Sequence, residues 1–164
     1  MKPFLTILAL STLVFCGRPA MAGGVVDASE RAAVLKVVDA FFSAMEARDA
    51  DAIRKLYQPK TQFVSGAPSK EGYALTQQSI EEFIPAAKQA PGAFLERTWS
   101  PEVLLDGRVA VVWARHDFHT GSKFCHNGRD CYVLLKTDQG WKIVSLVFSV
   151  EPAPHTENPA GPPK

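Results

Sequence analysis

Five polar or aromatic side chains are expected to share one face of two neighbouring strands. Side chains alternate between the faces of an extended chain, and one face of the segment 109–119 carries Trp113, Arg115, Asp117 and His119. A two-residue turn at Gly121-Ser122 would place His126 opposite Asp117 and so add a second imidazole to that face. A carboxylate beside an imidazole can fix the tautomer of the ring and tune its pKa, which is the chemistry of a general acid or base.

These residue types favour a pocket for a small polar or aromatic molecule. Asp117 and His126 are the candidate catalytic pair. The candidate ligand contacts are Tyr57, Trp113, Arg115 and His119. An aromatic wall with a few placed polar groups is typical of such pockets, and an arginine would orient an anionic or carbonyl group. A charged sheet face can equally lie against solvent or a second subunit, with Arg115 and Asp117 as a surface ion pair.

The same face raises the question of a metal site. His119, His126 and Asp117 could together supply two imidazoles and a carboxylate. His116 is left out of this set because the alternation of side chains points it to the opposite face. The chain has no Cys-x-x-Cys pair of the zinc-binding kind. The sequence therefore predicts no metal and no cofactor.

Two cysteines, Cys125 and Cys131, follow in the next strand, and they leave two arrangements open. On a straight strand their Cα atoms would be roughly 20 Å apart, far beyond the reach of a disulfide. Asn127-Gly128 is a strong turn signal, however, and a bend there would let the two thiols pair. An oxidising compartment would favour that disulfide.

The start of the chain indicates export. Lys2 precedes an apolar run from Phe4 to Phe15, and Ala20-Met21-Ala22 has the small residues of a cleavage site. This is the order of a secretory signal peptide, and the run is too short to span a bilayer. We predict a signal peptide over residues 1–22 and a periplasmic or secreted protein with no membrane attachment. The remaining chain is near neutral, which argues against a nucleic-acid partner.

The chain after the signal peptide divides into a lead-in (residues 23–27), one domain (28–150) and a tail (151–164). The tail is rich in proline and lacks an apolar run, which predicts disorder. Apolar residues recur at helical spacing from Val34 to Met45, and shorter helices are expected around residues 49–57 and 79–87. Pro85 is expected to kink or end the last of these helices.

The second half of the domain is strand-like. Alternating segments run from Phe94 to Val150, and the expected turns are at Asp106-Gly107, Gly121-Ser122 and residues 138–140. Pro101 marks a break or a bulge, and residues 66–72, before this half, are expected to form a loop. Helices followed by a meander of antiparallel strands predict an α+β fold with the helices on one face of the sheet.

Three segments resemble the nuclear-transport-factor-2-like superfamily, and specifically its SnoaL-like bacterial branch. They are ARDADAIRKLY after Phe41-Phe42, ERTWSPEVLLDGRVAVVWARHDFH, and GSKFCHNGRD followed by VLLKTDQGWKIVSLVFSVEP. Relatives usually carry Ser-His-Cys-Gly where this chain has Cys125-His126-Asn127-Gly128, so Cys125 and Asn127 depart from the pattern. The resemblance covers residues 28–152. It implies a curved antiparallel sheet wrapped around the N-terminal helices as a cone, a pocket at the open end, a strand kinked at Gly128 and a homodimer.

Three functions remain open at this point. A domain that binds a small molecule is favoured, because charged groups are few and the chain has no Gly-x-Ser-x-Gly, phosphate-loop or dinucleotide motif. The first alternative is an acid–base enzyme of the isomerase, dehydratase or cyclase type that uses Asp117 and His126. The second is a dimeric structural or partner-binding protein. The superfamily includes isomerases, cyclases, dehydratases, pure binding modules and many members of unknown role, so the fold alone does not choose among the three functions.

Overall fold

The computed structural model describes residues 28–152 and 155–163. The predicted signal peptide (1–22) and lead-in (23–27) lie outside the described residues and stay predictions. Helix α1 (Ala28–Glu46) is followed by α2 (Ala50–Leu56), strands β1 (Gln62–Ser69) and β2 (Gly72–Ser79), and α3 (Ile80–Gln89). Four long strands complete the domain: β3 (Phe94–Asp106), β4 (Val109–Thr120), β5 (Lys123–Thr137) and β6 (Gly140–Val150). None of the helices described here is long and apolar enough to cross a membrane.

The three helices begin and pack as their sequences dictate. The apolar stripe of α1 buries Val34, Val38, Phe41 and Met45. Asp49 caps α2, since its carboxylate accepts hydrogen bonds from the next backbone N–H groups at 3.1 and 3.0 Å. Ser79 and Glu82 form a capping box at the start of α3. Pro85 lies inside α3 and does not end it, because it forgoes one backbone hydrogen bond while the buried face of the helix holds it in place.

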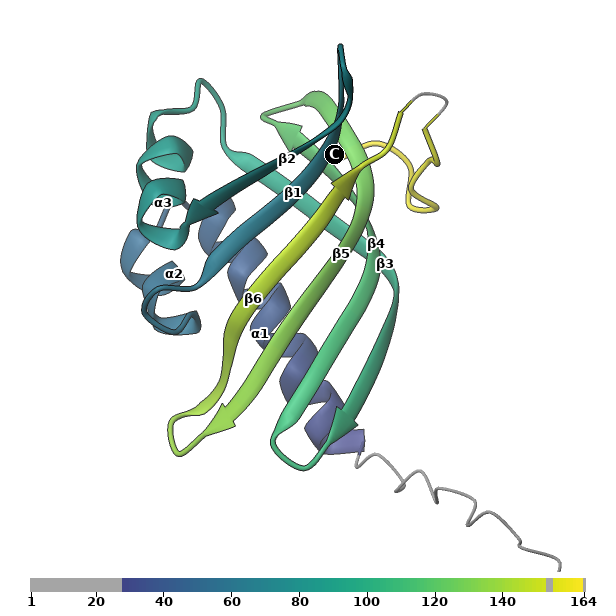
Figure 1. The fold of residues 1–164 in the computed structure, drawn as a ribbon. Coiled ribbons are helices and arrows are strands. Elements are labelled where there is room, and N and C mark those ends of the chain that lie inside the picture. The colour runs from purple at the N-terminus through teal and green to yellow at the C-terminus, as the bar shows by residue number, and fades with distance from the viewer. Residues whose placement is uncertain (1–27, 153–154, 164) are drawn as a thin grey trace, which may run out of the picture.

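The six strands form one curved sheet in the order β2-β1-β6-β5-β4-β3 (Figure 1). All neighbours are antiparallel except β1 and β6, which are parallel. The fold is therefore α+β, with a curved, mainly antiparallel sheet around the N-terminal helices, as predicted. Residues 66–72 are not a loop. They belong to the β1–β2 hairpin, where Tyr73 donates a hydrogen bond to the Gly66 carbonyl at 2.7 Å.

Irregular pairings bend the long strands. The β3–β4 register shifts between Trp99 and Glu102, which confirms the bulge predicted at Pro101. The β4–β5 register shifts between Phe118 and His119. Strand β5 runs through Gly128 without a hairpin, and a Cβ atom there would lie 1.7 Å from the Ser149 carbonyl oxygen. Only glycine allows so close an approach of β5 to β6.

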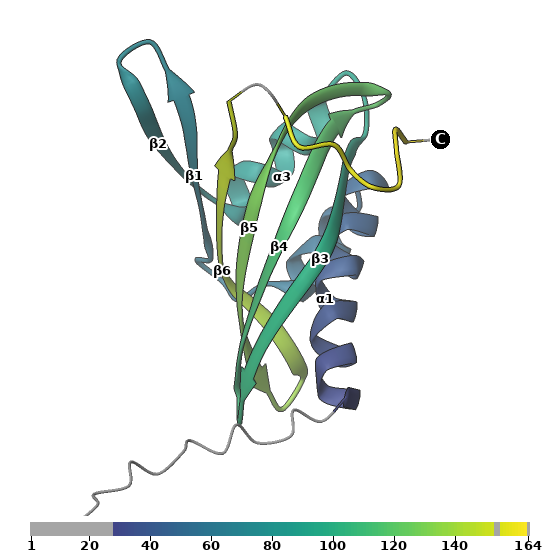
Figure 2. The ribbon, with the colours of Figure 1, turned by 90° about the vertical axis from the view of Figure 1, so that its right-hand side faces the viewer.

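The sheet has two unlike faces, which we call inner and outer. Helix α1 packs across the inner face against β3 and β6, and α3 lies beside β2 (Figures 1 and 2). The core between the helices and the inner face is rich in aromatic rings, among them Phe41, Phe63 and Tyr132. The outer face carries part of the tail: Thr156 accepts a hydrogen bond from the Asn127 side chain at 2.6 Å. Residues 155–163, for which the sequence predicts disorder, form neither a helix nor a strand.

Candidate functional site

A cavity of about 230 Å³ lies between the inner face and helices α1 and α3. Most of its wall is aromatic or aliphatic. The lining residues are Phe41, Met45, Phe63, Gln78, Phe83, Ala86, Phe94, Glu96, His116, Phe118, His126, Leu146 and Phe148. Neither lysine nor arginine is among them. The wall therefore suits an apolar ring system, and its only ionisable groups are a carboxyl and two imidazoles.

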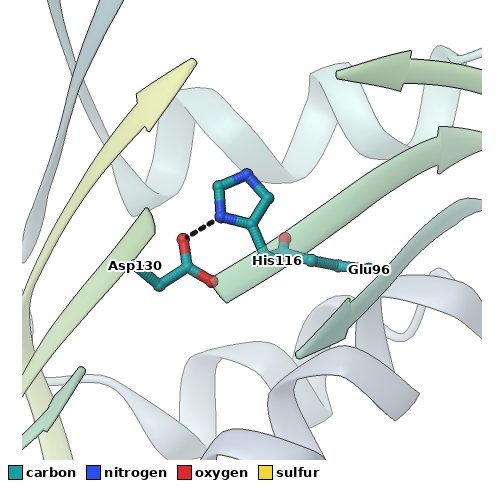
Figure 3. A group of neighbouring side chains, drawn as sticks. All are labelled: Glu96, His116 and Asp130. Carbon is teal, nitrogen blue, oxygen red and sulfur yellow. Dashed lines mark ion pairs between the residues drawn. The ribbon is translucent and has the colours of Figure 1, made fainter. Parts of the chain in front are cut away.

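The ionisable groups gather where β3, β4 and β5 run side by side. Glu96 pairs with Phe118 and Asp130 pairs with Ala114, so both are diagonal neighbours of His116 on the inner face. His116 and Asp130 are both 1% exposed, and the His116 Nδ1 atom lies 2.9 Å from an Asp130 oxygen (Figure 3). Glu96 and His116 line the cavity, whereas Asp130 contacts His116 and is not part of the cavity wall.

Burial raises the pKa values of the two carboxyls. Desolvation is the largest cause for Glu96, followed by the Asp130 charge, and together they place its pKa well above the ordinary range. Desolvation likewise raises the pKa of Asp130 to about 7, although a hydrogen bond with Glu96 acts to lower that pKa. Two carboxyls that share one buried site cannot both ionise without compensation. Both shifts favour the protonated forms of the two carboxyls.

Burial favours the uncharged forms of the two imidazoles. Burial lowers the pKa of His116, although the neighbouring carboxylates oppose the shift. Burial, then the charges of His116 and His155, lower the pKa of His126 to about 4. The His126 ring lies nearly parallel to Phe118 and Phe148, with centroids 5.1 and 6.3 Å away. Its Nδ1 atom is 3.4 Å from His116 Nε2, so the two rings can share one proton.

Several polar atoms of this cluster have no hydrogen-bond partner among the described residues. They are His116 Nδ1, Asp130 Oδ2 and the Tyr57 hydroxyl. The contact between His116 and Asp130 is short, yet it is not a hydrogen bond, so the carboxylate lies off the direction in which a ring N–H would point. Buried polar atoms are usually paired, which marks this cluster as a place where a further group belongs.

Most of the predicted site residues lie on the outer face. Trp113 is exposed, and Arg115 donates a hydrogen bond to the Thr156 hydroxyl at 3.2 Å. Asp117 is buried in an ion pair with Arg97. His119 lines a groove with Phe124 under the tail. The expectation that these residues share a face with His126 is wrong, because Asp117 pairs with Asn127 and His126 pairs with Phe118.

A β-bulge is the physical reason for this difference. The two-residue turn at Gly121-Ser122 is present, and His119 pairs with Phe124 as predicted. Cys125 is then an extra residue that no β4 residue opposes, and it shifts every later side chain of β5 to the other face. The bulge turns His126 inward, so the histidine excluded from the predicted site, His116, is the one that it meets.

The remaining predicted residues are placed as follows. Tyr57 is in the core, where its ring packs on Phe41 and Phe63 at centroid distances of 5.1 and 5.4 Å. Burial, with the charges of Glu96 and Asp130, raises the pKa of its hydroxyl well above the ordinary range. Cys125 and Cys131 are free thiols in the structure. The three residues considered as an alternative metal set, His119, His126 and Asp117, are split between the two faces.

Sequence reasoning missed Glu96, His116 and Asp130. The signal was present on one face of β4. His116 is the single polar side chain on that face, among Ala110, Val112, Ala114 and Phe118. That face must be the inner one, because apolar side chains are the ones that a covering helix buries. A histidine among them is a buried polar group that needs a partner. Glu96 and Asp130 carried no such local signal, since their proximity depends on strand register.

Comparison with known proteins agrees with this fold. Residues 29–149 match the family model described as "Putative lumazine-binding", called here the lumazine-binding-like family. None of the curated proteins is similar to the chain. An NTF2-like protein of unknown function from Silicibacter pomeroyi DSS-3 has 22% identity and a TM-score of 0.59, covering 75% of this chain and 97% of its own.

Two further solved structures share the fold at lower identity. An NTF2-like protein with a cystatin-like fold from Novosphingobium aromaticivorans has 12% identity and a TM-score of 0.62, with 76% of this chain and 84% of its own covered. A protein of unknown function with a cystatin-like fold from Nostoc punctiforme PCC 73102 has 10% identity and a TM-score of 0.60, with 77% and 94% covered. The nuclear-transport-factor-2-like fold is thus confirmed, and the SnoaL-like branch stays a prediction.

Proposed function

We propose that this chain, which belongs to the lumazine-binding-like family, binds a small planar aromatic molecule in the cavity on the inner face of its sheet. The observation that carries the proposal is the composition of the wall. Six phenylalanine rings surround the space, and the polar groups Glu96, His116 and His126 gather on the three adjacent strands β3, β4 and β5. Such a wall orients a flat ligand by stacking and by one polar edge.

The size of the cavity limits the ligand. Pockets for drug-sized molecules measure about 300–1,000 Å³, whereas this cavity measures about 230 Å³. One or two fused rings fit that space better than a larger molecule. The name of the family suggests a pteridine such as lumazine as a first probe.

The charges of the cavity limit the ligand further. Its wall has no lysine or arginine to balance an anion, and the raised pKa values of Glu96 and Asp130 show that negative charge is disfavoured at this site. A neutral heterocycle can instead accept a hydrogen bond from the protonated Glu96 and exchange one with His126. We therefore propose a neutral nitrogen heterocycle and expect carboxylate or phosphate derivatives to bind more weakly.

Two exposed positions of α3 allow a test of whether the ligand binds in the cavity. Ala86 is an exposed residue of α3 that lines the cavity, whereas Gln89 is exposed on the same helix and does not line it. Lumazine is titrated into the wild type, Ala86→Trp and Gln89→Trp, and its fluorescence is followed. We expect saturable binding that A86W abolishes and Q89W leaves unchanged. Equal binding by both variants, or binding by neither variant nor wild type across a panel of neutral bicyclic heterocycles, would contradict the proposal.

Acid–base catalysis on the bound molecule is a second candidate. The contact of His116 with Asp130 and the short path to His126 favour it, since they link a cavity imidazole to a buried carboxyl. Asp117 and His126, the pair expected from sequence, lie on opposite faces and do not form this link. Turnover of a bound heterocycle that Asp130→Asn slows without weakening binding would establish catalysis, and binding without turnover would leave a binding domain.

Two expectations from the sequence complete the proposal. The signal-peptide pattern supports export to the periplasm or the outside of the cell, where the protein would meet small molecules. The outer face exposes apolar side chains of Trp113, Leu135 and Val147, which support a homodimer through the sheet. Light scattering of Trp113→Lys against the wild type measures that assembly, and a wild-type monomer at micromolar concentration would exclude it.

A further inference from the structure

Glu96, His116 and Asp130 form a compact set of metal-ligating groups, of which Glu96 and His116 line the cavity. One ligand atom from each lies within 4.8 Å of the others. The three residues come from the adjacent strands β3, β4 and β5, whose pairing fixes their positions (Figure 3). A rigid sheet is therefore the scaffold of the set.

The unpaired atoms of this set point to a missing partner. Among the described residues, His116 Nδ1 has only the oblique Asp130 contact, Asp130 has only the Glu96 carboxyl as a hydrogen-bond partner, and both residues are 1% exposed. An unpaired buried polar atom is costly, and the cost disappears when the atom binds a cation. The cavity wall provides no lysine or arginine that could serve as that cation.

The distance between the two atoms suits a shared ion. His116 Nδ1 and Asp130 Oδ1 are 2.9 Å apart without a hydrogen bond between them. Two ligands at about 2.1 Å from one tetrahedral zinc ion are roughly 3.4 Å apart, so a side-chain rotation that lengthens this contact by about 0.5 Å would place both atoms on one ion. With an ion bound, the lone pair of His116 Nδ1 would point at the ion and not at the Asp130 carboxylate. This orientation agrees with the oblique contact between His116 Nδ1 and Asp130 Oδ1.

The second nitrogen of His116 is also arranged as in a metal ligand. Its Nε2 atom lies 3.4 Å from His126 Nδ1, so a proton on Nε2 can be donated to His126 while Nδ1 keeps its lone pair. Histidines that bind metals commonly use the other ring nitrogen in this way. His126 is fixed in turn between Phe118 and Phe148.

We propose that Glu96, His116 and Asp130 bind one divalent zinc ion, with the fourth position of the ion open to the cavity. One imidazole and two carboxylates are a ligand set that zinc accepts, and three protein ligands with one open position are typical of zinc sites that bind a substrate or water. The imidazole disfavours magnesium, which prefers oxygen ligands in octahedral geometry. This site goes beyond the binding of an organic molecule, and it is measured without one.

The test uses the purified protein after removal of metals with a chelator. Zinc is titrated by calorimetry into the wild type, Glu96→Gln, Asp130→Asn and two controls: Glu102→Gln, an exposed carboxylate of β3, and His155→Ala, an exposed histidine of the tail. We expect one zinc ion per chain in the wild type and in both controls. Affinity should fall by at least about ten-fold in E96Q and D130N, and magnesium should not compete.

Cobalt keeps the test decisive if E96Q or D130N fails to fold. The wild type with one equivalent of Co²⁺ should show visible ligand-field absorption and one strongly shifted exchangeable imidazole proton, that of His116. Three results would overturn the proposal. They are zinc binding that is lost in H155A, a cobalt-shifted proton that belongs to His119, and a wild type that binds no stoichiometric zinc. None of these outcomes depends on whether lumazine binds.

Discussion

His126 stands opposite Phe118 in the β4–β5 register, and the two rings stack at a centroid distance of 5.1 Å. This pairing places His126 inside the domain. Asp117, which directly precedes Phe118 in β4, points outward to Arg97. One extra residue in the strand, Cys125, decides which of two possible sites the domain has.

The two faces predict different responses to loss of an aromatic ring. Phe118→Ala should lower the free energy of unfolding by about 2–4 kcal/mol, because it removes a ring packed against Phe94 and His126. Phe124→Ala, at the exposed end of β5, should cost less than about 1 kcal/mol. Urea unfolding followed by circular dichroism measures both. Equal losses would show that the register described for β4 and β5 is wrong.

The Arg97–Asp117 ion pair is structural in this account. Asp117→Asn should destabilise the domain by about 2–4 kcal/mol, because it leaves the Arg97 guanidinium partly buried without its carboxylate. It should leave lumazine affinity unchanged, since neither residue lines the inner cavity. Thermal unfolding and the fluorescence titration together test this. A stable D117N that no longer binds would restore the sequence-based site.

Much of the fold follows from local sequence signals. The stripe of α1, the Asp49 and Ser79 caps and the turns at Gly107 and Gly121 each depend on residues close together in the chain, and all are present. The β1–β2 hairpin was missed because its tip lacks a recognisable turn pair and its strands carry few apolar residues. Such strands depend on pairing with a neighbour, in this case β6.

The site was harder to predict than the fold. Alternation gave the right residues for each face of β4, but the expected register put His126 on the outer face, whereas it lies on the inner face beside His116. The inner cavity lies under the helices, so its polar groups are the few that interrupt an apolar face. The bulge at Cys125, unlike the one at Pro101, has no proline to mark it, and Cys125 therefore could not be identified as an extra residue.

Close backbone approach at Gly128 gives a strong prediction. Gly128→Ala places a methyl group against the Ser149 carbonyl, which is main chain and has little room to move, so the loss should exceed about 3 kcal/mol. Gly66→Ala is the control, because the obstacle there is the outer edge of the exposed Tyr73 ring. Chemical unfolding of both variants should rank G128A well below G66A. The reverse order would contradict the strand pairing at Gly128.

The capping box of α3 predicts a pH effect on stability. The Ser79 backbone N–H and then its hydroxyl lower the pKa of Glu82 below the ordinary 4.5. A lowered pKa in the folded state means that the carboxylate stabilises the fold above its unfolded pKa, and that this stabilisation is lost as pH falls through the folded value. Glu82→Ala should therefore be less stable than wild type at pH 7, with a difference that shrinks below pH about 4.

The control for that experiment is Glu71→Ala, which removes an exposed carboxylate in the β1–β2 turn. Its stability should track the wild type at both pH values. A gap between wild type and E82A that stays constant down to acid pH would indicate that the cap does not depend on the charge of Glu82.

Nuclear magnetic resonance of the histidine and aromatic side chains tests the central claim, that the inner cavity is the ligand site. Lumazine is titrated into protein labelled at the histidine and phenylalanine rings, with the Trp113 indole as a marker of the outer face. The account predicts saturable shifts of His116, His126, Phe118 and Phe148, and none for Trp113, His119 or Phe124. Shifts confined to Trp113, His119 and Phe124 would contradict it and move the site to the outer face.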